Sequence, residues 1–188
     1  MRLFASTPVD EVTVQHIAAS VDMTPAAVYY HFASKEQILV EGMTHFRDSM
    51  LAELRDRLPV DGDESGVRVL LAAIVEWTAR HRTAATVYFV SSIGLNLLVE
   101  ALRRETRIEM VGLLRAAVLA ARGRTSSAEA GVIAVALVSL IETAVASMLN
   151  HDEAFRVLGA RRFAVEVAVI GDRIAGIRDV ATVDGRDR

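Results

Sequence analysis

The three prolines of this 188-residue chain all lie in its first third, and the remainder carries no proline. Beyond them, apolar residues recur at the three- and four-residue spacing of helices that bury one face. A loop is expected at PVDGDESG, residues 59–66, where proline, glycine and acidic residues cluster. An all-α fold is therefore predicted, with helices in this part over about 67–81, 83–98, 101–121, 128–150 and 160–177. The last residues, ATVDGRDR, are expected to be frayed.

The first third predicts two short helices followed by a long one. Thr13 is suited to cap a helix over 14–21, and Thr24 followed by Pro25 is an N-cap with proline at the first helical position of a helix to about residue 32. Ser34 and Gln37 form a capping box that begins a helix extending to about residue 58. A second capping box, Ser126 with Glu129, begins the helix near 128.

Composition limits the class of protein. Apolar residues make up 52% of the chain but aromatic residues only 5%, a mixture that suits closely packed helices. The absence of cysteine excludes disulfides, thiolate metal sites and cysteine nucleophiles, and is compatible with a reducing cytoplasm. The mean hydropathy is +0.32, but the longest uncharged runs, 83–99 and 130–141, fall short of a membrane span. We expect buried helices, no membrane or signal peptide, and apolar surface covered by a partner.

Charge and motifs weigh against several functions. The net charge is −3, and the first 47 residues carry three cations against five acids, 3 − 5 = −2, so nonspecific attraction to DNA is weak. The chain has no phosphate-binding loop, no dinucleotide glycine pattern and no hydrolase or metalloprotease motif. Its five histidines show no metal-ligand spacing. No enzyme, cofactor or metal site is expected.

The two short helices and their tight connection are typical of a helix-turn-helix unit, whose second helix enters the DNA major groove. The segment TVQHIAASVDMTPAAVYYHFASKEQILVEGM closely resembles the DNA-binding segment of the TetR family of bacterial transcription regulators. The resemblance rests on Thr13, on Ile17 and Ala18, on the YYHF sequence at 29–32, and on the SKE sequence at 34–36. It implies a helix-turn-helix head over 1–46, joined by the long helix to a larger helical effector-binding and dimerisation domain over 47–188.

The resemblance also implies DNA contacts. Lys35, the only lysine in the chain, would meet a phosphate at a helix N-terminus, where backbone N–H groups also favour an anion. Thr13 and Gln15 are expected to contact phosphates, and Tyr30 and His31 the DNA backbone. Tyr29 is expected at the edge of the groove. Base edges or the sugar-phosphate chain are expected to meet the front of the recognition helix, at Thr24, Pro25, Ala26 and Ala27. Alternatives remain for some of them: Tyr29 could pack on the next helix, and His31 and Lys35 could be solvated surface groups.

Three features depart from the family pattern. Asp22 stands in the turn where the family usually has glycine, and aspartate tolerates the left-handed conformation better than most residues. The front of the recognition helix has no Arg, Asn or Gln, so sequence selection would depend on methyl contacts, Gln15 and DNA shape. The family's first helix begins further upstream, and residues 1–6 correspond to its end. Core positions in the head are expected at Ile17, Val21, Val28 and Phe32.

The larger domain is expected to enclose a mostly apolar effector cavity with a few polar groups. Helical spacing brings together Trp77 with His81, and Tyr88 with Ser92 and Asn96, while Glu142 interrupts an apolar helix. These six are candidate ligand contacts. The alternative places Trp77 and Tyr88 in the core and pairs Glu142 with an arginine or with solvent.

A second copy of the chain is the expected partner for the last two long helices. Small and branched residues would form the interface: Val132, Ile133, Ala136, Leu137, Leu140, Val145, Val165, Val169 and Ile174. The sequence thus predicts a homodimeric regulator, a repressor by family analogy, that binds a near-palindromic double-stranded operator and is released by a small, largely apolar effector. The alternative is a helical small-molecule, lipid-binding or interaction protein that does not bind DNA.

Overall fold

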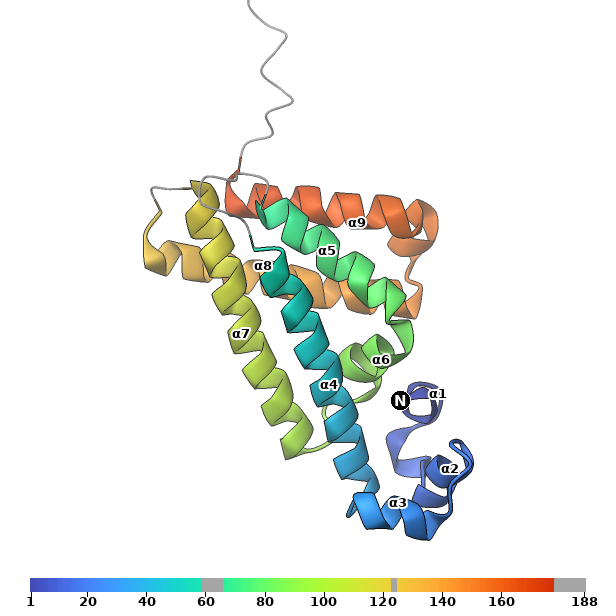
Figure 1. The fold of residues 1–188 in the computed structure, drawn as a ribbon. Coiled ribbons are helices and arrows are strands. Elements are labelled where there is room, and N and C mark those ends of the chain that lie inside the picture. The colour runs from blue at the N-terminus through green and yellow to red at the C-terminus, as the bar shows by residue number, and fades with distance from the viewer. Residues whose placement is uncertain (59–65, 123–124, 178–188) are drawn as a thin grey trace, which may run out of the picture.

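The computed structural model describes residues 1–58, 66–122 and 125–177, which contain helices and no strand. A small head and a larger body are joined by one long helix (Figure 1). The loop predicted over 59–66 lies outside the described residues except for Gly66, which begins α5. The predicted break at 123–124 and the predicted frayed end at 181–188 also lie outside them. The head consists of α1 (Arg2–Ser6), η1 (Val9–Glu11), α2 (Val14–Ala19), α3 (Pro25–His31) and the start of α4 (Lys35–Asp56).

The predicted caps fix where the helices of the head begin. The hydroxyl of Thr13 accepts a hydrogen bond from the N–H of His16, and that of Thr24 accepts one from Ala27, both at 3.2 Å. Ser34 accepts from the N–H of Gln37 at 3.3 Å. Each oxygen satisfies a backbone donor that the first turn of a helix leaves free. The helix starts predicted from these residues are confirmed.

The turn between α2 and α3 forms around Asp22, which has a φ of 54°. Left-handed backbone is accessible to aspartate at modest cost, so the turn forms without the family's glycine, as predicted. Val21 in this turn is 55% exposed, and its assignment to the core was wrong. Helix α2 ends at Ala19, so the helical spacing that would have turned Val21 inward stops before that residue.

The body comprises α5 (Gly66–Arg80), α6 (Arg82–Thr86), η2 (Val87–Ser91), α7 (Leu97–Arg122), α8 (Ser127–Asn150) and α9 (Glu153–Ala175). The single helix predicted over 83–98 is wrong, because η2 is a π-helical turn that ends the segment at Ser91. The side chain of Asn96 then accepts a hydrogen bond from the N–H of Val99, so α7 begins earlier than predicted. The break predicted at Gly159 is a kink within α9, where φ is 71°.

Helix α4 is buried along one face through most of its length. Its buried side chains face the body and share one core with those of α5, η2, α7 and α8: Leu39, Met43, Phe46, Met50, Leu51 and Leu54. The ring of Phe46 lies 5.1 Å from that of Trp77 and 5.3 Å from that of Tyr88. On its outer side, α4 forms ion pairs with α7 through Arg47–Glu105 at 3.8 Å and Arg55–Glu109. The long helix is thus fixed to the body on two sides.

Helices α8 and α9 leave apolar side chains in solvent. Val132 is 72% exposed and Val165 is 54% exposed, while Leu137 and Val145, which were predicted in the same interface, are fully buried inside the subunit. Those two assignments were wrong, because both residues point from α8 into the core of their own chain. Helix α8 is long and apolar enough to cross a membrane by composition, but nearly half of its apolar window is buried within the fold.

Gly171 provides a test of the close contact between α5 and α9. A Cβ at this position would overlap the side chain of Leu71 on α5, so Gly171→Ala should lower the free energy of unfolding by about 2 kcal/mol through overpacking. Urea unfolding followed by the fluorescence of Trp77 measures the change. In the matched control Gly112→Ala the added Cβ meets no atom within 4 Å, and the variant should gain ~0.5–1 kcal/mol. Equal effects in the two variants would contradict the packing described.

Candidate nucleic-acid interface and effector cavity

Helix α3 lies at the end of the head farthest from the body, with its outer face open (Figure 1). Tyr30 is 85% exposed and Tyr29 is 53% exposed, and neither ring is taken up by the core. Thr24, Pro25, Ala26 and His31 are exposed beside them, while Ala27 is half-buried. The ring of His31 packs edge-on against that of Tyr30, with centroids 5.0 Å apart. Apart from Ala27, the residues predicted to contact DNA from this helix therefore form one open surface.

The inner face of α3 supports that surface. Val28 is 4% exposed and forms a small separate cluster with Val14 and Ala18 of α2. Phe32 and Ile38 pack against this cluster from the two sides of the α3–α4 connection. The core positions predicted at Val28 and Phe32 are confirmed, and Ile17 is half-buried against the main core. Burial of these side chains fixes which face of α3 points outward.

Helix α2 adds polar groups at its first turn. Thr13 and Gln15 are both exposed. The oxygen of Thr13 accepts a hydrogen bond from the backbone as the helix cap, which leaves its own O–H free to donate. The same holds for the hydroxyl of Thr24 at the start of α3. Two helix caps are thereby also donors of the kind that phosphate oxygens accept.

The Lys35 ammonium holds the chain segment that precedes α2. Its Nζ lies 2.8 Å from the carbonyl oxygen of Val9, 3.1 Å from that of Asp10 and 2.9 Å from that of Val12. An ammonium has three N–H donors, and each of these contacts uses one. No pattern in the sequence indicated this arrangement. The phosphate contact expected of Lys35 stays a prediction, and it requires at least one donor to leave a carbonyl.

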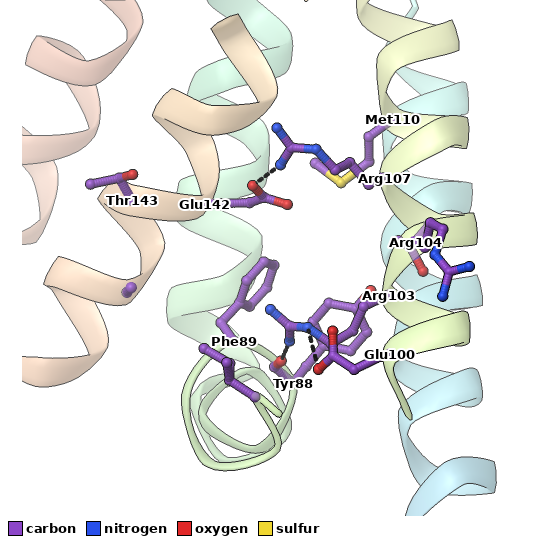
Figure 2. A pocket seen from close by; sticks show the side chains of 12 residues that line it. Tyr88, Phe89, Glu100, Arg103, Arg104, Arg107, Met110, Glu142 and Thr143 are labelled. Atoms are coloured by element: carbon purple, nitrogen blue, oxygen red, sulfur yellow. Dashed lines mark hydrogen bonds and ion pairs between the residues drawn. The ribbon is translucent and has the colours of Figure 1, made fainter. Parts of the chain in front are cut away.

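The body contains a cavity of ≈ 600 Å³ between η2, α7 and α8. Its apolar lining includes Phe89, Ile93, Met110 and Ala146, with the buried Tyr88 beside them. Figure 2 shows Arg107 extending from α7 toward Glu142 on α8 and Arg103 extending toward Tyr88 of η2, while Arg104 points the other way. The volume is within the range of cavities that bind small organic molecules.

Charged groups line one side of this cavity. Arg107 on α7 forms an ion pair with Glu142 on α8 and donates a second hydrogen bond to the hydroxyl of Ser139 at 2.9 Å. Arg103, one turn earlier, donates to the carbonyl of Tyr88 and lies 5.4 Å from the centre of its ring. Arg104 also lines the cavity and forms no ion pair with any residue that the structure describes. Burial raises the pKa of the Tyr88 phenol, an effect opposed by its hydrogen bond to Thr106 and by the Arg103 charge.

The structure places two of the six predicted ligand contacts, Tyr88 and Glu142, in the lining of this cavity. The other four have local partners elsewhere. Trp77 is buried, and His81 stacks on it at 4.0 Å. Ser92 donates to the carbonyl of Tyr88, and Asn96 caps α7. As ligand contacts all six stay predictions.

Sequence analysis missed the arginines of α7. Arg103 and Arg107 are four residues apart and so share one face of the helix with the neighbouring Met110. In the sequence they belong to the charged run RRETRIE, which is typical of a solvated helix face. The signal that could have identified them is the pair of apolar residues, Leu102 and Met110, that directly precede and follow this run.

Residues 1–41 match the family model described as bacterial regulatory proteins, tetR family. Among solved structures, that of a SmeT–triclosan complex is similar over 98% of this chain and 90% of its own, with a TM-score of 0.75 and 18% identity. The TetR family transcriptional regulator PfmR from Thermus thermophilus is similar over 94% of both chains, with a TM-score of 0.66 and 21% identity. No curated protein sequence matches the chain. At these identities the structural likeness establishes the fold.

A helix-turn-helix head with an open second helix, joined by one long helix to an all-helical body, is the architecture of DNA-binding transcription regulators. The comparisons make this more specific: residues 1–41 match the DNA-binding domain of the TetR family, and the chain as a whole has the fold of TetR-family regulators.

The Lys35 contacts can be tested by substitution. Lys35→Met removes three charge-assisted hydrogen bonds and should lower the free energy of local unfolding of α2 and α3 by about 2 kcal/mol. Hydrogen exchange of the backbone amides in these two helices measures the change. Arg115→Met, which removes an exposed cation of α7, should leave exchange in the head unchanged. Unaltered exchange in the Lys35 variant would show that the ammonium does not hold this segment.

Proposed function

We propose that the protein is a homodimeric TetR-type repressor that binds a near-palindromic operator and is released by a small molecule bound in the body. The observation that carries this proposal is the open outer face of α3, where Tyr30 is 85% exposed although its own helix is held by a buried inner face. An aromatic side chain is normally kept from water in a monomer's core, and its exposure here favours a contact surface.

The DNA contacts proposed are those predicted from sequence. Thr13, Gln15, Tyr30 and His31 would donate to phosphates, which positions the head without selecting sequence. Sequence selectivity would come from contacts of thymine methyl groups with the methyl groups of Thr24, Ala26 and Ala27 and with the ring of Pro25. DNA shape would add to this selectivity. Tyr29 would lie at the groove edge. With only a few cations in an acidic head, affinity should depend on hydrogen bonds and shape more than on counterion release.

A second copy is proposed to cover α8 and α9. Exposed apolar residues follow these two helices on the outside of the subunit: Val132, Val135, Val157, Val165, Ile170 and Ile174. Paired with the same residues of another subunit, they would form a self-complementary apolar interface. The pairing would set the spacing of the two recognition helices, as binding to adjacent major grooves requires.

Release by an effector would act through α7. One side of α7 lines the cavity with Arg103 and Arg107, while Glu105 and Glu109 on another side pair with Arg47 and Arg55 of α4. A ligand that binds best to one position of α7 would therefore bias the position of α4, at whose start the head is attached. SmeT, in the similar structure, is in complex with triclosan, which supports a small-molecule site in this fold.

DNA binding is tested by selection of bound fragments from genomic DNA, followed by affinity measurements on the enriched duplex. Tyr30→Phe removes a hydroxyl from a proposed phosphate contact. It should weaken binding to every duplex by about 1 kcal/mol, a roughly fivefold increase in Kd. His45→Ala, a change at an exposed position of α4 outside the proposed interface, should bind as the wild type does. If no duplex is enriched at modest salt, the alternative of a ligand-binding protein without DNA function is the better account.

The dimer is tested at the apolar face of α8 and α9. Val132→Glu and Val165→Glu would each place a carboxylate in the proposed interface and should weaken association by about 3 kcal/mol, more than a hundredfold. Multi-angle light scattering measures the molar mass over a dilution series. Ile108→Glu on α7, an equally exposed apolar position away from this face, should leave the mass unchanged. A wild type that is monomeric, or variants that remain dimeric, would exclude this interface.

A further inference from the structure

We propose that the effector is an organic acid, with its carboxylate on Arg103 and an apolar body against the opposite wall of the cavity between η2, α7 and α8. The inference rests on the proposed function, since it takes this cavity as the effector site. It differs from the sequence-based expectation of a largely apolar effector by adding one negative charge at a defined place.

The charge of Arg103 is poorly compensated in the structure. Its side chain is only 20% exposed, and its nearest acid, Glu100, lies 3.8 Å away. The carboxylate of Glu100 is shared, because the same oxygen also accepts a hydrogen bond from the N–H of Gly94 at 2.8 Å. A mostly buried guanidinium usually has a close acidic partner, preferably a bidentate one. Arg103 has instead one carbonyl, the ring of Tyr88 and a distant carboxylate, with the cavity in front of it (Figure 2).

Arg107, one turn further along α7, shows the contrast. It is paired directly with Glu142 and bound to Ser139, so its charge is compensated from α8. Arg104 at the edge of the cavity adds a further cation, for which the described parts of the chain provide no acid. Arg104 is exposed, so water screens its charge, and Arg103 is the cation of this cavity whose charge is least compensated. A ligand with one negative charge balances it.

A cationic effector is disfavoured by the same groups. Both carboxylates are engaged, Glu142 by Arg107 and Glu100 by Gly94 and Arg103. The phenol of Tyr88 is kept neutral because burial raises its pKa, so it provides no third anion. A ligand amine would have to displace Arg107 from Glu142 and would leave that guanidinium uncompensated.

The remaining walls define the rest of the ligand. Phe89 and Met110 are buried, and Ile93 at the mouth of the cavity is 60% exposed. A ligand with an apolar body would cover Ile93 and gain the free energy of removing that surface from water. A volume of ≈ 600 Å³ accommodates a medium-length alkyl chain or a fused pair of aromatic rings. An acid with such a body satisfies both the charged and the apolar sides.

Two probe series of matched shape test the proposal on the full-length protein by isothermal titration calorimetry. The flexible series is decanoate, decan-1-ol and decylammonium, below their micelle-forming concentrations. The rigid series is 2-naphthoate, 2-naphthol and 2-naphthylmethylammonium. In at least one series the acid should bind tenfold or more tightly than its neutral and cationic counterparts. Neutral or cationic probes that bind as tightly as the acid in both series would overturn the proposal.

Variants assign the selectivity to Arg103. Arg103→Met should reduce acid binding tenfold or more, while Arg103→Lys, which keeps the charge, should retain most of it. Arg115→Met on α7, outside the cavity, is the matched control and should bind the acid as the wild type does. Loss of binding in the control, or full retention in Arg103→Met, would contradict the assignment. Ala146→Trp should fill the cavity, and acid binding that survives it would place the site elsewhere.

The outcomes separate this proposal from the one on which it rests. Neutral probes that bind, and that Ala146→Trp excludes, would keep the cavity as an effector site and reject only the acid. If no probe of either series binds, the assignment of the cavity as an acid site fails. The DNA-binding function is measured independently, by enrichment of duplex fragments with the unliganded protein, and does not depend on either result.

Discussion

Burial of one face of α4 holds the molecule together, because this helix packs into both the head and the body. Leu39 and Met43 lie near the head, and Met50 to Leu54 lie deep in the body, so one continuous apolar surface fixes both ends. In the first turn of α4, the Lys35 ammonium donates hydrogen bonds to three carbonyl oxygens of the segment before α2 and so also attaches this segment to α4. The head has only a small cluster of its own around Val28, while Phe4, Val9 and Val12 join the main core, so its orientation depends on that shared core as well as on α4.

Two neighbouring helices, α7 and α4, connect the cavity with the head that carries the proposed DNA contacts. Helix α7 contacts α4 through ion pairs on one side and lines the cavity with arginines on another. Salt bridges between exposed groups contribute little to stability, so these pairs can be exchanged at small cost when α7 moves. The two helices also share the apolar core of the body, so a shift of α7 would reach α4 through packing as well as through the ion pairs. The combination of a firmly packed lever and a polar, adjustable contact suits a protein whose two sites influence one another.

Part of the candidate site could be predicted from the sequence because its signals are local. Thr13, Thr24 and Ser34 indicate helix starts, and the hydrogen bonds they make reach only three residues along the chain. The exposure of Tyr30 and the burial of Val28 follow from their places on opposite faces of one short helix. The prediction that Val21 lies in the core was wrong, because the helix that would have turned this side chain inward ends at Ala19. No local sequence pattern predicts the π-helical turn at η2, which ends at Ser91, so the helix predicted over 83–98 was too long.

The all-helical class, the helix starts in the head and the exposed face of α3 could all be read from the amino-acid order, because each depends on residues within one or two turns of each other. The partners of Lys35 lie 23 to 26 residues away, and those of Arg107 lie 32 and 35 residues away on α8. Both sets depend on the folded chain. The same is true of Leu137, which belongs to the core, whereas Val132 on the same helix faces outward. A long-range contact depends on how helices cross, and their crossing is set by the packing of all of them together, which no single segment of sequence specifies.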